Sequence, residues 1–145
     1  MFSLVIPLFN EANNIEPLIG ELFKSLKKFQ TYELILVNDA STDETLDKIK
    51  KITSNKIKIL NNPSNLGQSF SIHSGIRNSK YNIIVTLDGD GQNNPTDIPR
   101  LLEFYLLNED IFLVGGIRTK RMDSATKVIS SKVANTIRSF ILQDD

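Results

Sequence analysis

The chain has 145 residues, enough for one domain with a hydrophobic core of its own. Its 17 Lys+Arg residues balance 17 Asp+Glu residues, so no overall positive charge favours nucleic acid as a partner. The absence of cysteine excludes disulfides and thiol chemistry. No stretch resembles a signal peptide or an apolar membrane span of ~20 residues, so we expect a cytoplasmic protein.

Strand-like and helix-like patterns alternate along the chain. Short apolar runs rich in β-branched residues predict five strands, over residues 3–8, 32–37, 56–60, 83–87 and 110–115. Apolar residues at helical spacing predict the intervening helices, over residues 15–29, 44–52, 68–79, 96–106 and 124–142. This alternation predicts an α/β fold with a mostly parallel sheet and helices on both faces, in which residues 83–87 form a buried central strand.

Polar residues precede three of these helices and are predicted to cap them. Asn13 or Asn14 is expected to cap the first helix, and Thr96 the fourth. Ser41, with Glu44 three residues later, has the spacing of a capping box before the second helix. Asp43 is assigned to the same capping region rather than to a ligand site.

An acidic loop, Asp88-Gly89-Asp90-Gly91-Gln92, follows the fourth predicted strand directly. Residues i and i+2 at a strand end point the same way, so Asp88 and Asp90 can converge on one cation. Hard oxygen ligands without His or Cys favour Mg²⁺ or Mn²⁺. An ordinary Asp-Gly turn is the alternative. A calcium loop of the EF-hand type is excluded, because its sixth and twelfth positions would be Asn93 and Pro99.

Polar loops follow all five predicted strands. Right-handed crossovers place the carboxyl ends of parallel strands at one edge of the sheet, which is where ligands of such sheets bind. The loops expected to meet there are residues 9–14, 38–43, 61–68, 88–94 and 118–123. Their convergence predicts a ligand site built from most of the chain.

Five segments resemble the successive motifs of family 2 glycosyltransferases: VIPLFNEANNI, VNDASTDET, NPSNLGQSFSIHSGI, LDGDGQNNPTDIP and GGIRTKRMDS…ISSKVAN. The resemblance covers essentially the whole chain and is greatest to the transferases that act on dolichyl or undecaprenyl phosphate. It implies a GT-A, Rossmann-like fold and a role in glycan biosynthesis. It further implies inverting transfer of a sugar from a GDP- or UDP-sugar to a polyprenyl phosphate, with Mg²⁺ or Mn²⁺, at the cytoplasmic face of a membrane.

The resemblance also implies roles for single residues. The residues implied in nucleotide-sugar binding are Pro7, Phe9, Asn10, Glu11, Asp39, Asn65, Gly67, Gln68 and Asp88. Those implied in holding the metal are Asp88, Asp90 and Gln92, with Asp88 and Asp90 also catalytic. Those implied in binding the acceptor phosphate are Arg118, Arg121, Lys127 and Ser131. Phe9 stands where the family usually has Tyr, which keeps base stacking but removes a hydroxyl contact.

Three other functions stay open at this point. One is a family 2 enzyme with a sugar hydroxyl as acceptor, which would need a general base. The second is a sugar-nucleotide-binding module without catalysis. The third, a sugar-nucleotide pyrophosphorylase, is disfavoured because no glycine-rich phosphate loop follows the first strand.

The chain is expected to be a single catalytic domain, residues 1–145, that is truncated on its acceptor side. The last helix pattern runs through Leu142, and only Gln143-Asp144-Asp145 follows it. In the resembled enzymes an acidic, glycine-containing motif begins at this place and leads into a further wall of the acceptor site. We therefore expect donor binding with little or no transfer, and poor protection from hydrogen exchange over residues 124–145.

Overall fold

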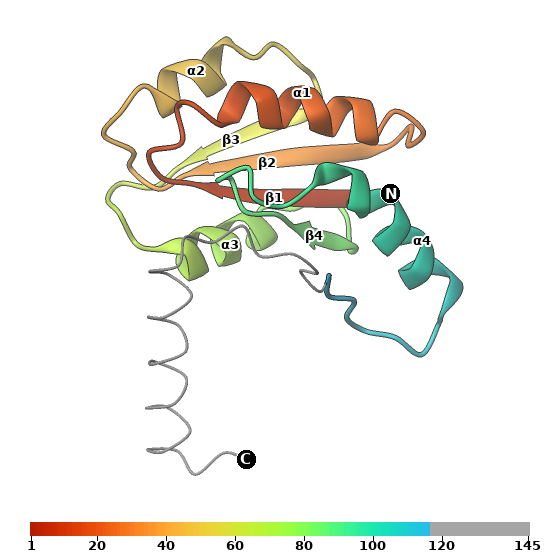
Figure 1. The fold of residues 1–145 in the computed structure, drawn as a ribbon. Helices are drawn as coiled ribbons and strands as arrows, with labels where there is room; N and C mark the ends of the chain where they lie inside the picture. Colours follow the sequence, from red (N-terminus) through yellow and green to blue (C-terminus); the bar gives the residue numbers. More distant parts are fainter. Residues whose placement is uncertain (117–145) are drawn as a thin grey trace, which may run out of the picture. The chain divides into compact units, whose positions relative to one another are not determined.

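The computed structural model describes residues 1–116, of which residues 1–114 form one compact unit. Four parallel strands form its sheet in the order β3-β2-β1-β4 (Figure 1): β1 (Phe2–Leu8), β2 (Tyr32–Asn38), β3 (Ile57–Asn61) and β4 (Ile84–Thr86). The helices are α1 (Ile15–Ser25), α2 (Thr45–Lys51), α3 (Gln68–Arg77) and α4 (Ile98–Leu107), with a 3₁₀ turn, η1 (Pro95–Asp97), before α4. The predicted α/β fold with a parallel sheet is confirmed.

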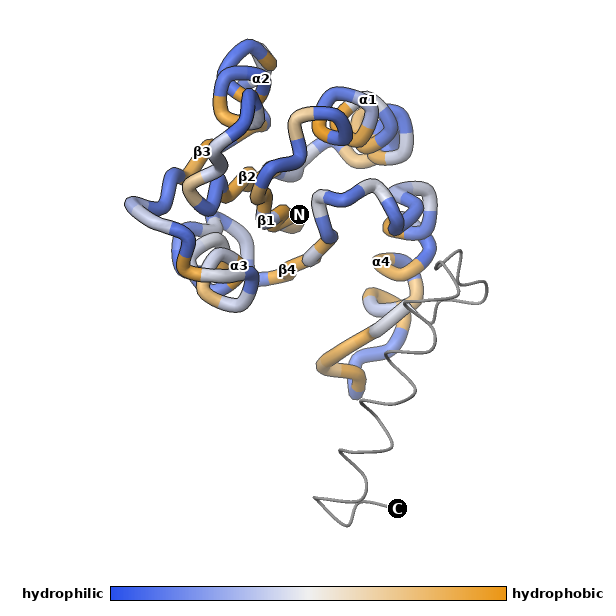
Figure 2. Tube along the Cα trace, turned by 60° about the vertical axis from the view of Figure 1, so that its left-hand side comes forward, coloured by the Kyte–Doolittle hydropathy of each residue, from blue (hydrophilic) through white to orange (hydrophobic). Residues whose placement is uncertain are grey.

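Helices cover both faces of the sheet, with α1 and α2 on one face and α3 on the other (Figure 1). Side chains alternate between the faces with the period of two that a strand imposes. Leu4 and Ile6 of β1 join the large core cluster that contains the apolar face of α1, whereas Val5 joins the smaller cluster on the opposite face. The middle strands β1 and β2 therefore carry mainly apolar residues on both faces (Figure 2).

Helix α3 packs unusually close to the sheet. A methyl group at Gly75 would lie 2.3 Å from Cγ1 of Val5, so only glycine permits this approach. Ser71, one turn earlier on the same face of α3, is fully buried. Small residues on the packing face explain why the sequence pattern of this helix is weak.

The order of the strands creates a switch point between β1 and β4. From β1 the chain moves outward to β2 and β3, and then returns past β1 to form β4. Val5 pairs with Thr86, so the loop after β4 begins beside Pro7 and Leu8 at the end of β1. Ligands of open α/β sheets bind in the crevice at such a switch point, outside the carboxyl ends of the strands.

Two strand predictions need correction. Residues 110–115 form no strand; Phe112 and Leu113 are 93% and 87% exposed, so this apolar run is not buried in the described structure. Strand β4 was predicted to be central and buried, but it lies at the edge of the described sheet and is only partly buried. The helix predicted over residues 124–142 falls outside the described residues, and the single domain over 1–145 stays a prediction.

The capping predictions for α1 and α4 are corrected by contacts that a local pattern cannot show. Asn14 occupies the N-cap of α1, but its side-chain amide donates to Glu11 instead of accepting a backbone N–H. Asn94, rather than Thr96, provides the cap before α4, since its side chain accepts from the backbone N–H of Thr96 at the start of η1. A polar residue is thus present at both predicted helix starts, but at α1 its side chain bonds a different partner, and before α4 a different residue provides the cap.

The predicted Ser41–Glu44 capping box does not form. Helix α2 begins at Thr45, whose backbone N–H donates to Asp43, which confirms Asp43 as a capping residue. Ser41 accepts instead from the backbone N–H of Asn10 in the preceding loop. Glu44 is the N-cap residue by position and makes no capping hydrogen bond with its side chain.

Within residues 1–116, no helix has the length and apolar character needed to cross a membrane.

Candidate functional site

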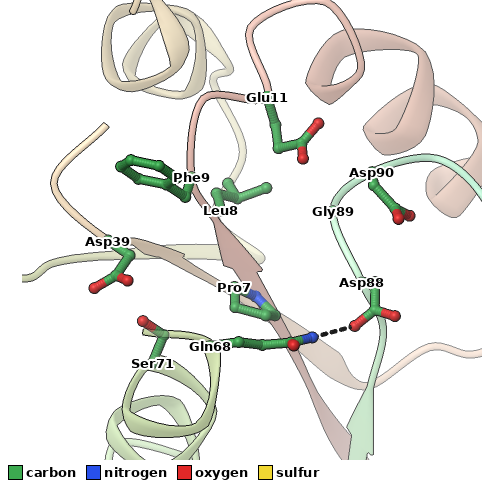
Figure 3. A pocket seen from close by; sticks show the side chains of 10 residues that line it. All are labelled: Pro7, Leu8, Phe9, Glu11, Asp39, Gln68, Ser71, Asp88, Gly89 and Asp90. Atoms are coloured by element: carbon green, nitrogen blue, oxygen red, sulfur yellow. Dashed lines mark hydrogen bonds between the residues drawn. The ribbon is translucent and has the colours of Figure 1, made fainter. Parts of the chain in front are cut away.

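A pocket of about 260 Å³ lies at the carboxyl edge of the sheet, at the β1–β4 switch point (Figure 3). It is lined from three strand ends and from the first turn of α3. The lining residues are Pro7, Leu8, Phe9, Glu11, Asp39, Gln68, Ser71, Asp88, Gly89 and Asp90. In Figure 3, Phe9 and Asp39 lie on one side of the pocket, and Asp88 and Asp90 lie on the other.

The acidic side of the pocket depends on a glycine. A methyl group at Gly89 would lie 2.4 Å from Cδ2 of Leu8 and 2.9 Å from the backbone carbonyl oxygen of Pro7. The loop after β4 therefore passes against the end of β1 at a distance that no larger residue allows. This close approach brings the carboxylates of Asp88 and Asp90 to the pocket wall.

The carboxylates of Asp88 and Asp90 are held by amide donors. Oδ1 of Asp88 accepts from Nε2 of Gln68 at 2.6 Å, and its Oδ2 accepts from Nδ2 of Asn93 at 3.2 Å. Oδ1 of Asp90 accepts from the backbone N–H of Gln92 at 3.0 Å. A carboxylate oxygen has two lone pairs, so each of these oxygens keeps capacity for a further ligand.

The donor set suits a hard divalent cation. Asp88 and Asp90 supply carboxylate oxygens, and within residues 1–116 the only ion pair joins Lys28 to Glu103, away from the pocket. The acids of the pocket are thus not neutralised by Lys or Arg of the described chain. No group of three or more His, Cys, Asp or Glu side chains in the described part could enclose a metal. Mg²⁺ is commonly held by only one or two protein carboxylates, because waters and substrate phosphates complete its coordination shell.

Asp39 follows β2 directly and ties the pocket to the loop before α3. Its Oδ1 accepts from Nδ2 of Asn62 at 2.7 Å and from the backbone N–H of Leu66 at 2.9 Å. Its Oδ2 accepts from the backbone N–H of Gly67 at 2.8 Å. Burial raises the pKa of Asp39, but the hydrogen bonds from Asn62, Leu66, Gly67 and Ser71 outweigh it and leave the pKa below its ordinary value. Asp39 is therefore an ionised acceptor at neutral pH.

The loop after β1 is fixed by the loop after β2. Asn10 adopts a left-handed backbone conformation with φ of 58°, and its side-chain oxygen accepts from the backbone N–H of Thr42 at 2.8 Å. The backbone N–H of Glu11 donates to Oγ1 of Thr45 at 2.8 Å. These contacts hold the two loops together beside Phe9, a pocket-lining residue that is 44% exposed.

The structure brings together most of the site residues expected from the sequence. Seven of them line the pocket: Pro7, Phe9, Glu11, Asp39, Gln68, Asp88 and Asp90. Four other expected site residues lie within residues 1–116 but do not line the pocket: Asn10, Asn65, Gly67 and Gln92. The amide of Asn10 serves the contact between loops, and Gly67 acts through its backbone N–H to Asp39. Arg118, Arg121, Lys127 and Ser131, expected to bind the acceptor phosphate, lie outside the described residues.

Three lining residues were missed in the sequence: Leu8, Ser71 and Gly89. The position of Gly89 between two aspartates is a local signal for close backbone approach. Leu8 and Ser71 carry no such signal, because their place in the pocket depends on which strand end α3 packs against. Asn62 and Asn93, which hold Asp39 and Asp88, were missed for the same reason.

Comparison with known proteins was made at the level of sequence and of structure. The family model described as Glycosyl transferase family 2 matches residues 3–144. Dodecaprenyl-phosphate galacturonate synthase of Rhizobium johnstonii is 34% identical over 137 residues, which are 92% of this chain and 40% of that protein. Undecaprenyl-phosphate 4-deoxy-4-formamido-L-arabinose transferase of Yersinia pestis is 36% identical over 138 residues, 92% of this chain and 41% of that protein.

Solved structures share the fold. The glucosyl-3-phosphoglycerate synthase of Mycobacterium tuberculosis, in complex with UDP, superposes with a TM-score of 0.69 at 22% identity, covering 95% of this chain and 50% of that one. The mannosyltransferase PcManGT of Pyrobaculum calidifontis, in complex with GDP-Man and Mn²⁺, superposes with a TM-score of 0.67 at 18% identity, covering 76% of this chain and 33% of that one.

The sheet order and these superpositions define an α/β fold of the GT-A type. The family model matches nearly the whole sequence, and the chain belongs to glycosyl transferase family 2. It spans about two fifths of the length of the curated relatives named above.

Proposed function

We propose that the pocket binds a nucleotide-sugar and that the chain is part of an inverting glycosyltransferase acting on a polyprenyl phosphate. The observation that carries this proposal is the division of one pocket into two sides. An exposed aromatic ring, Phe9, stands near the ionised Asp39 on one side, and Asp88 and Asp90 stand on the other. A nucleoside diphosphate needs both: a surface for its base and oxygen ligands for the cation that accompanies its diphosphate.

The acidic side would hold Mg²⁺ or Mn²⁺ through Asp88 and Asp90, with Gln92 as a further candidate. A cation held there would neutralise charge on the departing nucleoside diphosphate. Asp90 accepts from the backbone N–H of Gln92 within its own loop, and its carboxylate lies at the pocket wall (Figure 3). We assign it a second task, the stabilisation of positive charge that develops on the anomeric carbon.

The acceptor chemistry fits a chain without an obvious general base. A lipid monophosphate has a second pKa of about 6, so it is mainly dianionic at neutral pH and attacks without losing a proton first. In the transfer, an oxygen of this phosphate bonds to the anomeric carbon while the bond from that carbon to the diphosphate oxygen breaks. The electron pair leaves with the diphosphate, and in-line attack inverts the anomeric centre. Arg118, Arg121, Lys127 and Ser131 are proposed to position the acceptor phosphate.

The proposal rests further on the relatives, whose names specify dodecaprenyl phosphate and undecaprenyl phosphate. The test is incubation of the chain with Mn²⁺, a short polyprenyl phosphate and either UDP-glucose or GDP-mannose. Mass spectrometry then follows the glycosylated lipid and the released nucleoside diphosphate. Transfer to a sugar hydroxyl but not to the lipid phosphate would favour a hydroxyl acceptor. Binding of the donor without any transfer would favour a binding module.

One variant separates the donor side from the acceptor side. Arg118→Ala is expected to leave nucleotide affinity unchanged and to increase the lipid-phosphate concentration needed for transfer. Loss of nucleotide affinity in Arg118→Ala would instead place Arg118 on the donor side.

A further inference from the structure

Asn14 lies between two segments that form the pocket, although it does not line the pocket itself. At the start of α1, its Nδ2 donates to Oε2 of Glu11 at 2.6 Å. A methyl group at Gly91 would lie 4.0 Å from Cγ and from Oδ1 of Asn14, so this side chain also lies beside the acidic loop. Glu11 lines the pocket, and the acidic loop carries Asp88 and Asp90. Asn14 thus joins two parts of the pocket that follow different strands.

The backbone of Glu11 is held from both directions, whereas its side chain is held by one contact. The Glu11 N–H donates to Oγ1 of Thr45 at 2.8 Å, and the Glu11 carbonyl oxygen accepts from the N–H groups of Asn14 and Ile15. Within residues 1–116, the hydrogen bond to the Glu11 carboxylate comes from the Asn14 amide. The glutamate side chain has several rotatable bonds, so this contact decides where the carboxylate points.

Without that contact, electrostatic repulsion would favour rotation of Glu11 out of the pocket. In Figure 3 the Glu11 side chain lies at the pocket wall between Phe9 and Asp90. Asp88 and Asp90 line the same pocket, and no Lys or Arg of residues 1–116 forms an ion pair with these acids. Like charges repel each other across the pocket, so a free Glu11 carboxylate favours the solvent. A ligand would then have to order this side chain on binding, which lowers affinity.

We propose that Asn14 is a positioning residue, which fixes the Glu11 carboxylate so that its second oxygen accepts a hydroxyl group of the bound donor. This inference rests on the proposed binding of a nucleotide-sugar. Because Oε2 of Glu11 accepts from the Asn14 amide, Oε1 keeps its lone pairs for a ligand. The ribose and the transferred sugar of a donor both carry hydroxyl groups, and either suits a carboxylate acceptor.

Asn14→Ala removes the amide without changing the charge, and Asn13→Ala is the matched control. Asn13 is the same residue type one position earlier, exposed and outside the pocket lining. The measurement is calorimetric titration with UDP and with UDP-glucose at one Mn²⁺ concentration. Loss of the ordered side chain should lower the affinity of Asn14→Ala by about threefold or more, whereas Asn13→Ala should bind as the wild type does. A smaller loss with both ligands would overturn the inference.

The two ligands also distinguish the sources of the hydroxyl group. A loss already present with UDP places the hydroxyl on the ribose, and a loss with UDP-glucose alone places it on the transferred sugar. Either result supports the role of Asn14. If the wild-type chain binds neither ligand, the proposed function itself fails, and this inference fails with it.

A reversed pair separates positioning from a merely structural role. Asn14→Asp keeps a residue that suits a helix start but sets a second carboxylate against Glu11, so affinity should fall. When Glu11→Gln is added, the new amide can donate to the new carboxylate and keep its carbonyl oxygen for the hydroxyl group. The double variant should therefore bind about threefold or more tightly than Asn14→Asp. No recovery in a folded double variant would contradict the inference; if Asn14→Asp does not fold, the Asn14→Ala titrations decide.

Discussion

The side-chain amide of Gln68 donates to Oδ1 of Asp88 at 2.6 Å, and this hydrogen bond joins the first turn of α3 to the acidic loop (Figure 3). The two residues are 20 positions apart in sequence, and their contact crosses the end of β1. It connects the side of the pocket that carries Asp39 with the side that carries Asp90. The orientation of the Asp88 carboxylate therefore depends on a residue from another element.

Gln68→Ala should weaken Mn²⁺-dependent nucleotide binding. Without the amide, the Asp88 carboxylate loses a neutral donor that holds one of its oxygens, a contact worth about 1 kcal/mol, or roughly fivefold in affinity. Titration of the variant with UDP and Mn²⁺ measures the loss. Ser69→Ala, one residue further along α3 and outside the pocket lining, is the control and should bind normally. Equal affinities for the two variants would contradict a role for Gln68.

Gly89→Ala should impair binding more than it impairs the fold. Its methyl group would meet Leu8 and the Pro7 carbonyl oxygen, so the acidic loop must shift away from the end of β1. We expect UDP affinity in the presence of Mn²⁺ to fall at least tenfold while the thermal midpoint changes by only a few degrees. Gly115→Ala, where an added methyl group meets nothing within 4 Å, is the control. Unchanged binding in Gly89→Ala would show that the loop position is not critical.

Gly75→Ala should destabilise the protein. The added methyl group would lie 2.3 Å from Cγ1 of Val5, and overpacking of this kind costs about 1–3 kcal/mol. Gly20→Ala in α1 offers the opposite case, because its methyl group meets nothing within 4 Å and alanine favours a helix by up to ~1 kcal/mol. Urea denaturation of both variants should show opposite changes in the free energy of unfolding. A change of the same sign and size in both would contradict the packing of α3 on β1.

Stability should fall in acid partly because of Asp39. Its pKa in the folded protein lies below the ordinary value of 3.8, so its contribution is fully present above that pH and is lost as the pH falls below 3.8 toward the folded pKa. Asp39→Asn should lower the free energy of unfolding by about 1–3 kcal/mol near neutral pH and by less near pH 3. Urea denaturation across this range is the measurement. A constant difference between variant and wild type would contradict a lowered pKa at Asp39.

Much of the fold could be predicted because its signals are local. The apolar runs that became β1 and β2 are buried on both faces, and the polar loops after them mark where they end. The run 110–115 has a similar apolar character but is not paired as a strand within residues 1–116, so composition alone gave a wrong prediction there. A pattern in sequence shows that a segment can pair and does not supply the partner.

The candidate site was predicted less completely, because its geometry depends on contacts between distant segments. Asp39 was expected to contact the nucleotide, but its bonds to Asn62 and to Leu66 cannot be read from either segment alone. Ser41 was expected to cap α2, yet it accepts from Asn10, 31 residues earlier. A capping pattern describes which hydrogen bonds a side chain can make, and the packing of the loops decides which of them form.

The most direct measurement is calorimetric titration of the chain with UDP in Mn²⁺ and again in EDTA, for the wild type and for Asp90→Asn. If Asp88 and Asp90 hold the cation that accompanies the diphosphate, wild-type affinity should fall at least tenfold in EDTA. Asp90→Asn, with a folded circular dichroism spectrum, should bind equally weakly in both conditions. Equal wild-type affinity with and without metal, or full Mn²⁺-dependent binding by Asp90→Asn, would contradict the proposed metal-dependent nucleotide site.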